Sequence, residues 1–389
     1  MNTSIMSQRY EFVLLAQQRG VCFQALCRRF GVSRKTGYKW KRRFVASGRA
    51  GLADRSRRPH GSPRLSSRQV TADVLALRQA NPAWGGRKLR RRLQDLKQAA
   101  PSASTCTAIL RRADLLVKDR PAVRPWQRFQ RAQPNELWQM DFKGHFATQA
   151  GPRCHPLTVL DDHSRFNLVL AASADQTGRT VREALLPAFR TYGLPEAILC
   201  DNGAPWGQGD PVCPYTSLTI WLMQLGVRVL HGRPYHPQTQ GKDERFHRTL
   251  HLELLSRHTW SDLAHCAQEF PRYRLRYNCE RPHDALGGDT PVIHYQPSPR
   301  SLPPHLPQIE YPANYLIKIV PAAGDFVFKG QSWYIGRAFA ELPVGQRPSP
   351  QADGQWEVFF SHHLIGQINL SGPPSPKHTH HSIYPQNPT

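Results

Sequence analysis

The strongest constraint on the fold is a run of short apolar segments that alternates with helical patterns between residues 137 and 257. Five segments are typical of buried strands, namely 137–142, 157–161, 166–171, 197–200 and 227–230. The first three follow one another through short turns and predict an antiparallel meander. The later two alternate with helices, which are expected at 179–192, 217–225 and 242–257, and should add in parallel. The pattern predicts a five-stranded mixed sheet flanked by helices.

Three acidic residues lie at informative places in this pattern. Asp141 lies in the first strand segment, Asp201 follows the fourth, and Glu244 lies at the start of the last helix. Two carboxylates on strands and one on a helix can converge on two divalent ions about 4 Å apart, a pair that promotes phosphoryl transfer. Hard oxygen ligands select Mg²⁺ or Mn²⁺ over zinc. One such acid alone is commonly a cap or an ion-pair partner, but the three together favour catalytic metal ligands.

The other polar residues of the last helix have less specific signals. Arg248 and His251 share the helical face of Glu244 and can reach substrate phosphates, and Lys242 can also touch DNA. Ordinary surface roles fit these three residues equally well. Asp243 is expected to point about 100° away from Glu244 and not to be a ligand.

Charge is distributed very unevenly along the chain. The net charge is +24, and residues 1–130 hold 29 Lys and Arg against 6 Asp and Glu, whereas residues 131–389 hold 23 against 22. A basic block of this density most often meets a polyanion. A disordered basic arm is the alternative, but apolar periodicity runs through most of the block and favours folded DNA-binding modules.

Residues 1–50 are predicted to form a helix-turn-helix domain. Helices are expected over 8–18, around 23–30 and over 33–45, with a turn at Gly31 and a cap at Ser33. Trp40 should pack inward while the cations of the third helix face a major groove. These cations are Arg34, Lys35, Lys39, Lys41, Arg42 and Arg43. A generic helical bundle is the alternative.

Residues 51–66 are predicted to be a basic linker, and residues 67–118 a second helical DNA-binding domain. The linker arginines Arg55, Arg57 and Arg58 can follow phosphates or a minor groove, although a solvated linker fits nearly as well. In the second domain, a helix beginning near Gly86 holds more cations than a core helix would, which favours a DNA-facing surface over a merely solvated one. They are Arg87, Lys88, Arg90, Arg91 and Arg92.

The C-terminal part has a different pattern. Residues 310–371 alternate at strand period and predict a small all-β barrel. Residues 372–389 are rich in Pro and His and are expected to be disordered.

Cysteine usage and hydropathy indicate the compartment. The 8 cysteines include no C-x-x-C pair, which argues against a structural zinc site, and several lie in apolar runs, as in proteins of reducing compartments. Neither a signal peptide nor a stretch long enough to span a bilayer is apparent. We expect a cytoplasmic, nucleoid-associated protein with no membrane partner.

Five sequence stretches together carry a family resemblance. They are PNELWQMDF at 134–142, DDHSRF at 161–166, CDNG at 200–203, RPYHPQTQGKDERFHRTL at 233–250 and YNCERPH at 277–283. With these motifs the chain resembles the integrase-core transposases of bacterial insertion sequences, within the retroviral integrase superfamily. The stretch between Asp201 and Glu244 is longer than is usual in the family, and the surplus is placed in 207–214. Helix-turn-helix units occupy the place of the zinc module of integrases.

The resemblance implies an RNase H-like core over 131–297, with Asp141, Asp201 and Glu244 as the DDE triad. It implies cleavage and joining of DNA strands with two Mg²⁺ or Mn²⁺ ions. The partners would be the terminal inverted repeats, target DNA and at least a second copy of the chain. A nuclease on the same fold, and a DNA-binding regulator whose catalytic centre is no longer used, are the alternatives.

Overall fold

The structure is a computed structural model and describes residues 5–55, 65–116, 130–207, 214–232, 241–351, 353–370 and 381–382. The chain divides into two compact units, residues 1–65 and residues 66–389.

The first unit is a small helical domain, as the sequence predicted. Its elements are α1 (Ile5–Leu15), α2 (Phe23–Arg29), α3 (Arg34–Ser47) and the short 3₁₀ helix η1 (Gly48–Leu52). The side chain of Ser33 caps α3 by accepting a hydrogen bond from the Thr36 amide. Trp40 packs edge-on against Phe12, with the ring centroids 5.6 Å apart. Gly37 is buried, and a Cβ there would lie 2.8 Å from the Phe12 ring, so the helix crossing explains a glycine at this position.

The second unit begins with three helices around their own apolar core. They are α4 (Arg68–Ala80), α5 (Gly86–Asp95) and α6 (Ala103–Arg112). Trp84 and Leu89 are fully buried in this core. The Ser102 side chain caps α6 by accepting a hydrogen bond from the Thr105 amide. Gly86 lies where α5 meets α6, and a Cβ there would approach the Ala103 carbonyl oxygen to 2.4 Å.

A five-stranded mixed sheet follows, which confirms the prediction. Its strands are β1 (Trp138–Phe142), β2 (His155–Asp161), β3 (Asn167–Ser173), β4 (Ala197–Cys200) and β5 (Arg228–His231), in the order β3-β2-β1-β4-β5. The pairs β1–β2 and β2–β3 are antiparallel, whereas β1–β4 and β4–β5 are parallel.

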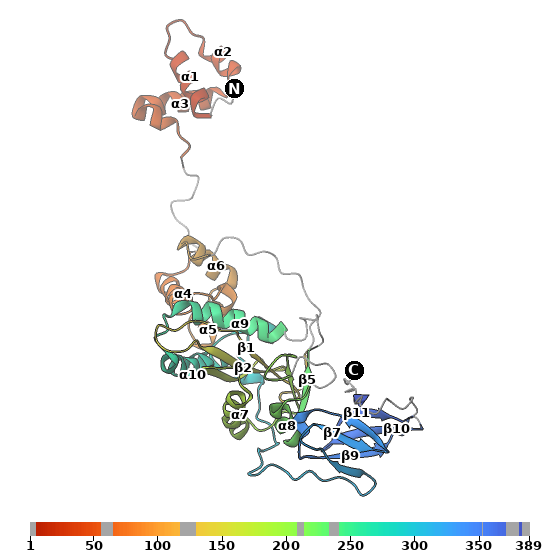
Figure 1. Cartoon of the computed structure of the whole chain (residues 1–389). Coiled ribbons are helices and arrows are strands. Elements are labelled where there is room, and N and C mark those ends of the chain that lie inside the picture. The colour runs from red at the N-terminus through yellow and green to blue at the C-terminus, as the bar shows by residue number, and fades with distance from the viewer. Residues whose placement is uncertain are drawn as a thin grey trace. The chain divides into compact units, whose positions relative to one another are not determined.

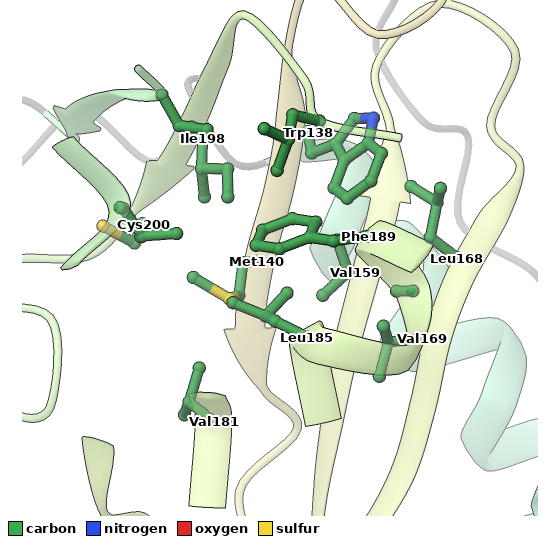
Figure 2. Packing of buried hydrophobic residues seen from close by; sticks show 14 of the residues in the cluster. Trp138, Met140, Val159, Leu168, Val169, Val181, Leu185, Phe189, Ile198 and Cys200 are labelled. Atoms are coloured by element: carbon green, nitrogen blue, oxygen red, sulfur yellow. The ribbon is translucent and has the colours of Figure 1, made fainter. Parts of the chain in front are cut away.

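Helices cover both faces of this sheet (Figure 1). The elements concerned are α7 (Gly178–Tyr192), α8 (Ser217–Gln224), α9 (Gly241–Glu253), α10 (Leu263–Cys279) and the 3₁₀ helices η3 (Leu255–Arg257), η4 (Asp284–Leu286) and η5 (Pro291–His294). Phe189 and Leu185 of α7 pack against Trp138 and Met140 of β1 (Figure 2). On the opposite face, α9 and α10 pack against β2 and β3 around Phe270. Helices α7 and α8 therefore cover one face of the sheet, and α9 and α10 cover the other face over β2 and β3.

The C-terminal part consists of two small sheets. Strands β6 (Leu316–Ile319), β9 (Pro343–Pro348), β10 (Gln355–Phe360) and β11 (His363–Asn369) form one sheet, while β7 (Asp325–Phe328), β8 (Gln331–Tyr334) and β12 (His381–Ser382) form the other, with η6 (Arg337–Phe339) between β8 and β9. They share a core that includes Ile220 and Met223 of α8. The strand content agrees with the sequence, but closure into a barrel stays a prediction. Of the tail predicted to be disordered, the structure describes only β12, which pairs with β8.

Among the described residues, every helix falls short of the length and apolar character that crossing a bilayer requires.

The crossing of α5 and α6 generates a stability prediction. Gly86→Ala should lower the local unfolding free energy of these helices by about 2 kcal/mol, because the added methyl group meets backbone atoms that cannot move away cheaply. Gly85→Ala is the control, since a Cβ at Gly85 meets nothing within 4 Å. Native-state hydrogen exchange of the α5 and α6 amides measures both effects. Equal effects of the two variants would contradict this account.

Candidate active site

Two of the predicted acids lie side by side at the end of the parallel strand pair. In the β1–β4 register Trp138 is opposite Ile198 and Gln139 is opposite Leu199. Continuing that register puts Asp141 beside Asp201, the residue directly after β4. Neighbouring strands lie about 4.8 Å apart, and alternate side chains point to opposite faces. Both carboxylates therefore point away from the face that α7 covers.

Their electrostatics reflect this closeness. Burial, followed by the charge of Asp201 and a smaller effect of Glu244, raises the pKa of Asp141 to about 6, against the opposing effect of the Phe142 amide. Burial also raises the pKa of Asp201, against the opposing effects of the Gly203 amide and His231. The Phe142 amide donates to Asp141 Oδ1 at 2.8 Å, and the Gly203 amide to Asp201 Oδ1 at 3.0 Å. The site therefore crowds carboxylates, a charge arrangement that a bound cation would relieve.

The third acid, Glu244, is carried by α9, which packs against β1 and β2. Glu244 is exposed, whereas its neighbour Asp243 is buried, with 1% of its surface exposed. The Thr158 hydroxyl is 3.1 Å from Asp243 Oδ1. Potential ligand atoms of Asp141, Asp243 and His247 all lie within 4.8 Å of one another. Burial, followed by the charge of Asp141, raises the pKa of Asp243 well above its ordinary value, while burial lowers the pKa of His247 to about 4.

The sequence analysis predicted that Asp243 points in a different direction from Glu244, and the structure agrees. It did not predict that the Asp243 side chain is buried against the sheet. A signal was present in the helix itself. Phe246, Leu250 and Leu254 follow Asp243 at three, seven and eleven positions and form a buried stripe. Asp243 lies on the same side of the helix as this stripe, so its carboxylate faces the sheet and contacts Thr158 of β2. His247, one turn after Asp243, had no separate signal.

Other predicted residues near the site have varied surroundings. Lys242 forms an ion pair with the buried Asp162 and donates to its carbonyl oxygen at 3.1 Å, and burial lowers the lysine pKa to about 8. Arg248 and His251 are exposed on α9. Trp206 is buried against Phe142, with the ring centroids 5.7 Å apart.

The predicted DNA-binding residues of the first unit are open to solvent. On α3, Arg34, Lys35, Lys39 and Arg42 are exposed and Arg43 is partly exposed. The ion pairs of the described residues include none of these five; in this unit the recorded pair joins Arg9 to Asp54. Arg55 is also exposed, while Arg57 and Arg58 lie outside the described residues.

The cations of α5, in contrast, face carboxylates in the segment after α10. Arg91 is 2.8 Å from both Asp95 and Asp289. Similar pairs join Arg92 to Glu280 at 2.8 Å and Arg87 to Asp284 at 3.5 Å. Burial, followed by the charge of Arg281, lowers the pKa of Lys88 to about 8. Asp95 lies one turn after Arg91 in the same helix, but the sequence could not reveal Glu280, Asp284 and Asp289 as partners, because they lie far along the chain.

The raised pKa of Asp141 predicts a pH-dependent stability effect without divalent ions. The ordinary pKa is 3.8 and the folded value about 6, so the penalty on the ionised form is absent at low pH and complete above pH 6. With a chelator present, Asp141→Asn should raise the free energy of unfolding by about 2 kcal/mol at pH 7.5. Little change is expected at pH 4.

Urea denaturation at the two pH values checks this. Asp175→Asn is the matched control, because the Thr180 hydroxyl lowers the pKa of Asp175 and its replacement should destabilise the protein at pH 7.5. A gain for Asp141→Asn that is equal at pH 4 and pH 7.5 would contradict the electrostatic origin.

Comparisons with known families agree with this architecture. Residues 131–237 and 225–291 match two models described as integrase core domains. Residues 8–60 match a helix-turn-helix domain and residues 36–110 a homeodomain-like domain. Residues 316–373 match the C-terminal domain of IS481 family transposases.

Curated relatives and solved structures are distant. An uncharacterised 39.2 kDa protein of insertion element IS476 from Xanthomonas euvesicatoria is 28% identical over 62% of this chain and 69% of that protein. An uncharacterised 31.7 kDa protein of IS407 from Burkholderia multivorans is 31% identical over 39% of this chain and 52% of its own length. The HTLV-2 integrase catalytic core in complex with magnesium has a TM-score of 0.31 and 16% identity, over 42% of this chain and 99% of that one.

The domain matches cover the helical modules, the mixed sheet and the C-terminal strands in turn. Over residues 131–291 the chain is thus similar to integrase core domains, and it combines that match with matches to helix-turn-helix domains and to the C-terminal domain of IS481 family transposases.

Proposed function

We propose that this chain is a DNA transposase that binds the terminal inverted repeats of an insertion sequence and cleaves and joins DNA strands. The observation that carries the proposal is the placement of Asp141 beside Asp201 by the β1–β4 register, with Glu244 on α9 acting on the pKa of Asp141. Strand-end carboxylates joined by a helical glutamate suit metal-dependent phosphoryl transfer.

The donor set fits divalent metal ions. Carboxylate oxygens are the ligands that Mg²⁺ and Mn²⁺ prefer, and the mutual repulsion of Asp141 and Asp201 is relieved by a cation. We propose that Asp141, Asp201 and Glu244 hold two such ions. When bound, the ions supply Lewis-acid activation of the attacking oxygen and charge stabilisation for the leaving oxygen.

The protein residues provide binding and orientation, with no covalent enzyme intermediate. In the first step, water forms a bond to phosphorus and the bond to the 3′ oxygen breaks, which leaves a 3′-hydroxyl at the element's end. In the second, that hydroxyl forms a bond to a target phosphorus and a target 3′ oxygen leaves. Arg248 and His251, which are exposed on α9, would contact phosphates near Glu244. Lys242 would contribute by anchoring α9 to Asp162 as well as by contacting DNA.

DNA recognition is assigned to the helical modules. The exposed cations of α3 are suited to contacts in a major groove. Arg55, Arg57 and Arg58 would contact the phosphates of the adjacent DNA backbone. Arg87 and Arg91 of α5 would reach DNA only by exchanging their carboxylate partners for phosphates, and Lys88 only by leaving its largely buried position. Bringing two element ends together requires at least a dimer on DNA. This activity belongs in the cytoplasm, at the nucleoid.

The central test is strand transfer by the full chain. With a pre-cut donor end, a supercoiled target and Mg²⁺ or Mn²⁺, wild-type protein should give joined products. Asp201→Asn should reduce them at least about a thousandfold, because one lost metal ligand costs several kcal/mol of transition-state stabilisation. Glu183→Gln, an exposed acid on α7, is the control and should leave joining unchanged.

Two outcomes would favour the alternatives. Metal-dependent nicking without joined products would indicate a nuclease on this fold. Binding to the repeats with neither nicking nor joining would indicate a regulator.

A second test concerns the DNA contacts. Replacing both Lys39 and Arg42 by Ala should weaken repeat binding and reduce the slope of log affinity against log salt by about 0.9 for each phosphate that the protein no longer neutralises. Arg91→Ala should change that slope less, since Arg91 is already paired with Asp95 and Asp289. Filter binding or fluorescence anisotropy over a salt series measures both. A larger change for Arg91→Ala would move the main DNA contact from α3 to α5.

A further inference from the structure

We propose that Thr158 is a positioning residue for metal binding at Asp141, and that it acts through Asp243 and His247. The inference rests on the proposed function and adds three side chains that the DDE pattern does not contain.

Thr158 lies directly opposite Asp141 across the antiparallel β1–β2 pair. It is fully buried, and its hydroxyl lies 3.0 Å from the Asp141 carbonyl oxygen, 3.1 Å from Asp243 Oδ1 and 2.8 Å from His247 Nε2. A hydroxyl has one hydrogen and two lone pairs, so it donates to one oxygen at a time, the Asp141 carbonyl or Asp243 Oδ1, and it can accept from His247 Nε2–H. One side chain of β2 thereby joins β1 to two successive turns of α9.

Neighbouring groups also limit the positions that the Asp141 carboxylate can take. Its Oδ1 accepts the Phe142 amide at 2.8 Å, and its Oδ2 lies 4.0 Å from His247 Nδ1. The opposite ring nitrogen of His247 is the one held by Thr158. The hydroxyl therefore fixes the imidazole ring, and the ring limits the positions open to the Asp141 carboxylate.

The cluster also sets where α9 begins relative to the sheet. Asp243 and His247 face inward one turn apart, while Glu244 between them is exposed. Because Asp243 is buried and polar, it needs a hydrogen-bond partner, and Thr158 is the one recorded among the described residues. Holding Asp243 against β2 fixes the first turn of α9, and with it the distance of Glu244 from Asp141.

The physical reason for this arrangement is preorganisation. Residues that orient metal ligands by hydrogen bonds commonly change metal affinity 10–100-fold when they are replaced. Valine keeps the shape of threonine but lacks the hydroxyl. Thr158→Val should therefore release His247 and Asp243 together, even though Thr158 is not expected to touch the metal.

The test measures Mn²⁺ binding by the full chain without DNA, from the electron paramagnetic resonance signal of free Mn²⁺. Thr158→Val should weaken Mn²⁺ binding about 10–100-fold, and Thr158→Ser, which restores the hydroxyl, should lie within about threefold of wild type. His247→Ala should weaken binding to a similar extent, which keeps the test decisive if Thr158→Val does not fold.

Thr219→Val is the matched control for lost stability. Thr219 is also buried, and its hydroxyl serves the capping box of α8 on the opposite face of the sheet. Its replacement should lower the melting temperature without changing the Mn²⁺ affinity.

The outcomes separate the inference from the proposed function. Wild-type protein that takes up no Mn²⁺ and joins no strands would refute both. Wild-type protein that binds Mn²⁺ would leave the function standing, and three results would then refute the role of Thr158 alone. They are unchanged binding in Thr158→Val, a loss confined to His247→Ala, and an equal loss in Thr219→Val.

Discussion

The parallel pairing of β1 with β4 fixes the geometry on which the proposed chemistry depends. Trp138 and Met140 of β1, with Ile198 and Cys200 of β4, are buried under α7 and α8. Because strand side chains alternate, a slip of one residue would turn these apolar groups outward and drive carboxylates into the core. The apolar core therefore selects the register that sets Asp141 beside Asp201. Hydrophobic burial holds two like charges together, and the raised pKa of Asp141 reflects first the burial of its carboxyl group and then the repulsion by Asp201.

Helix α9 divides its polar residues between two environments. Its inward face carries Asp243 and His247, which reach the sheet at Thr158, while its outward face carries Glu244 and Arg248. The inner contacts exchange solvent for fixed hydrogen bonds, and the outer residues remain free to meet a substrate. A helix arranged in this way can present a carboxylate at a defined place without burying it.

The parts of the fold that depend on local pattern could be predicted from the sequence. Residues 197–200 form the predicted strand with the same bounds, and the helix at 178–192 begins one residue earlier than expected. The local sequence pattern could not predict which side chains come into contact in the tertiary structure. Asp243 was not expected to be a ligand because it points about 100° away from Glu244 on the helix, although the stripe that includes Phe246 placed it toward the core. The ion pair between Arg91 of α5 and Asp289 could not be predicted either, because the two residues are distant in sequence and meet only in the folded chain.

Among the described residues, the cations of α3 and α5 have different surroundings. The α3 cations have no carboxylate partner among the described ion pairs, whereas Arg91 and Arg92 are matched by Asp289 and Glu280. Exposed or half-exposed pairs of this kind contribute little stability each, but several along one helix fix its orientation. Phosphates can compete for such cations, and that exchange weakens as salt rises. The two helices should thus respond differently to DNA: α3 through direct contact, and α5 through the exchange of one anion for another.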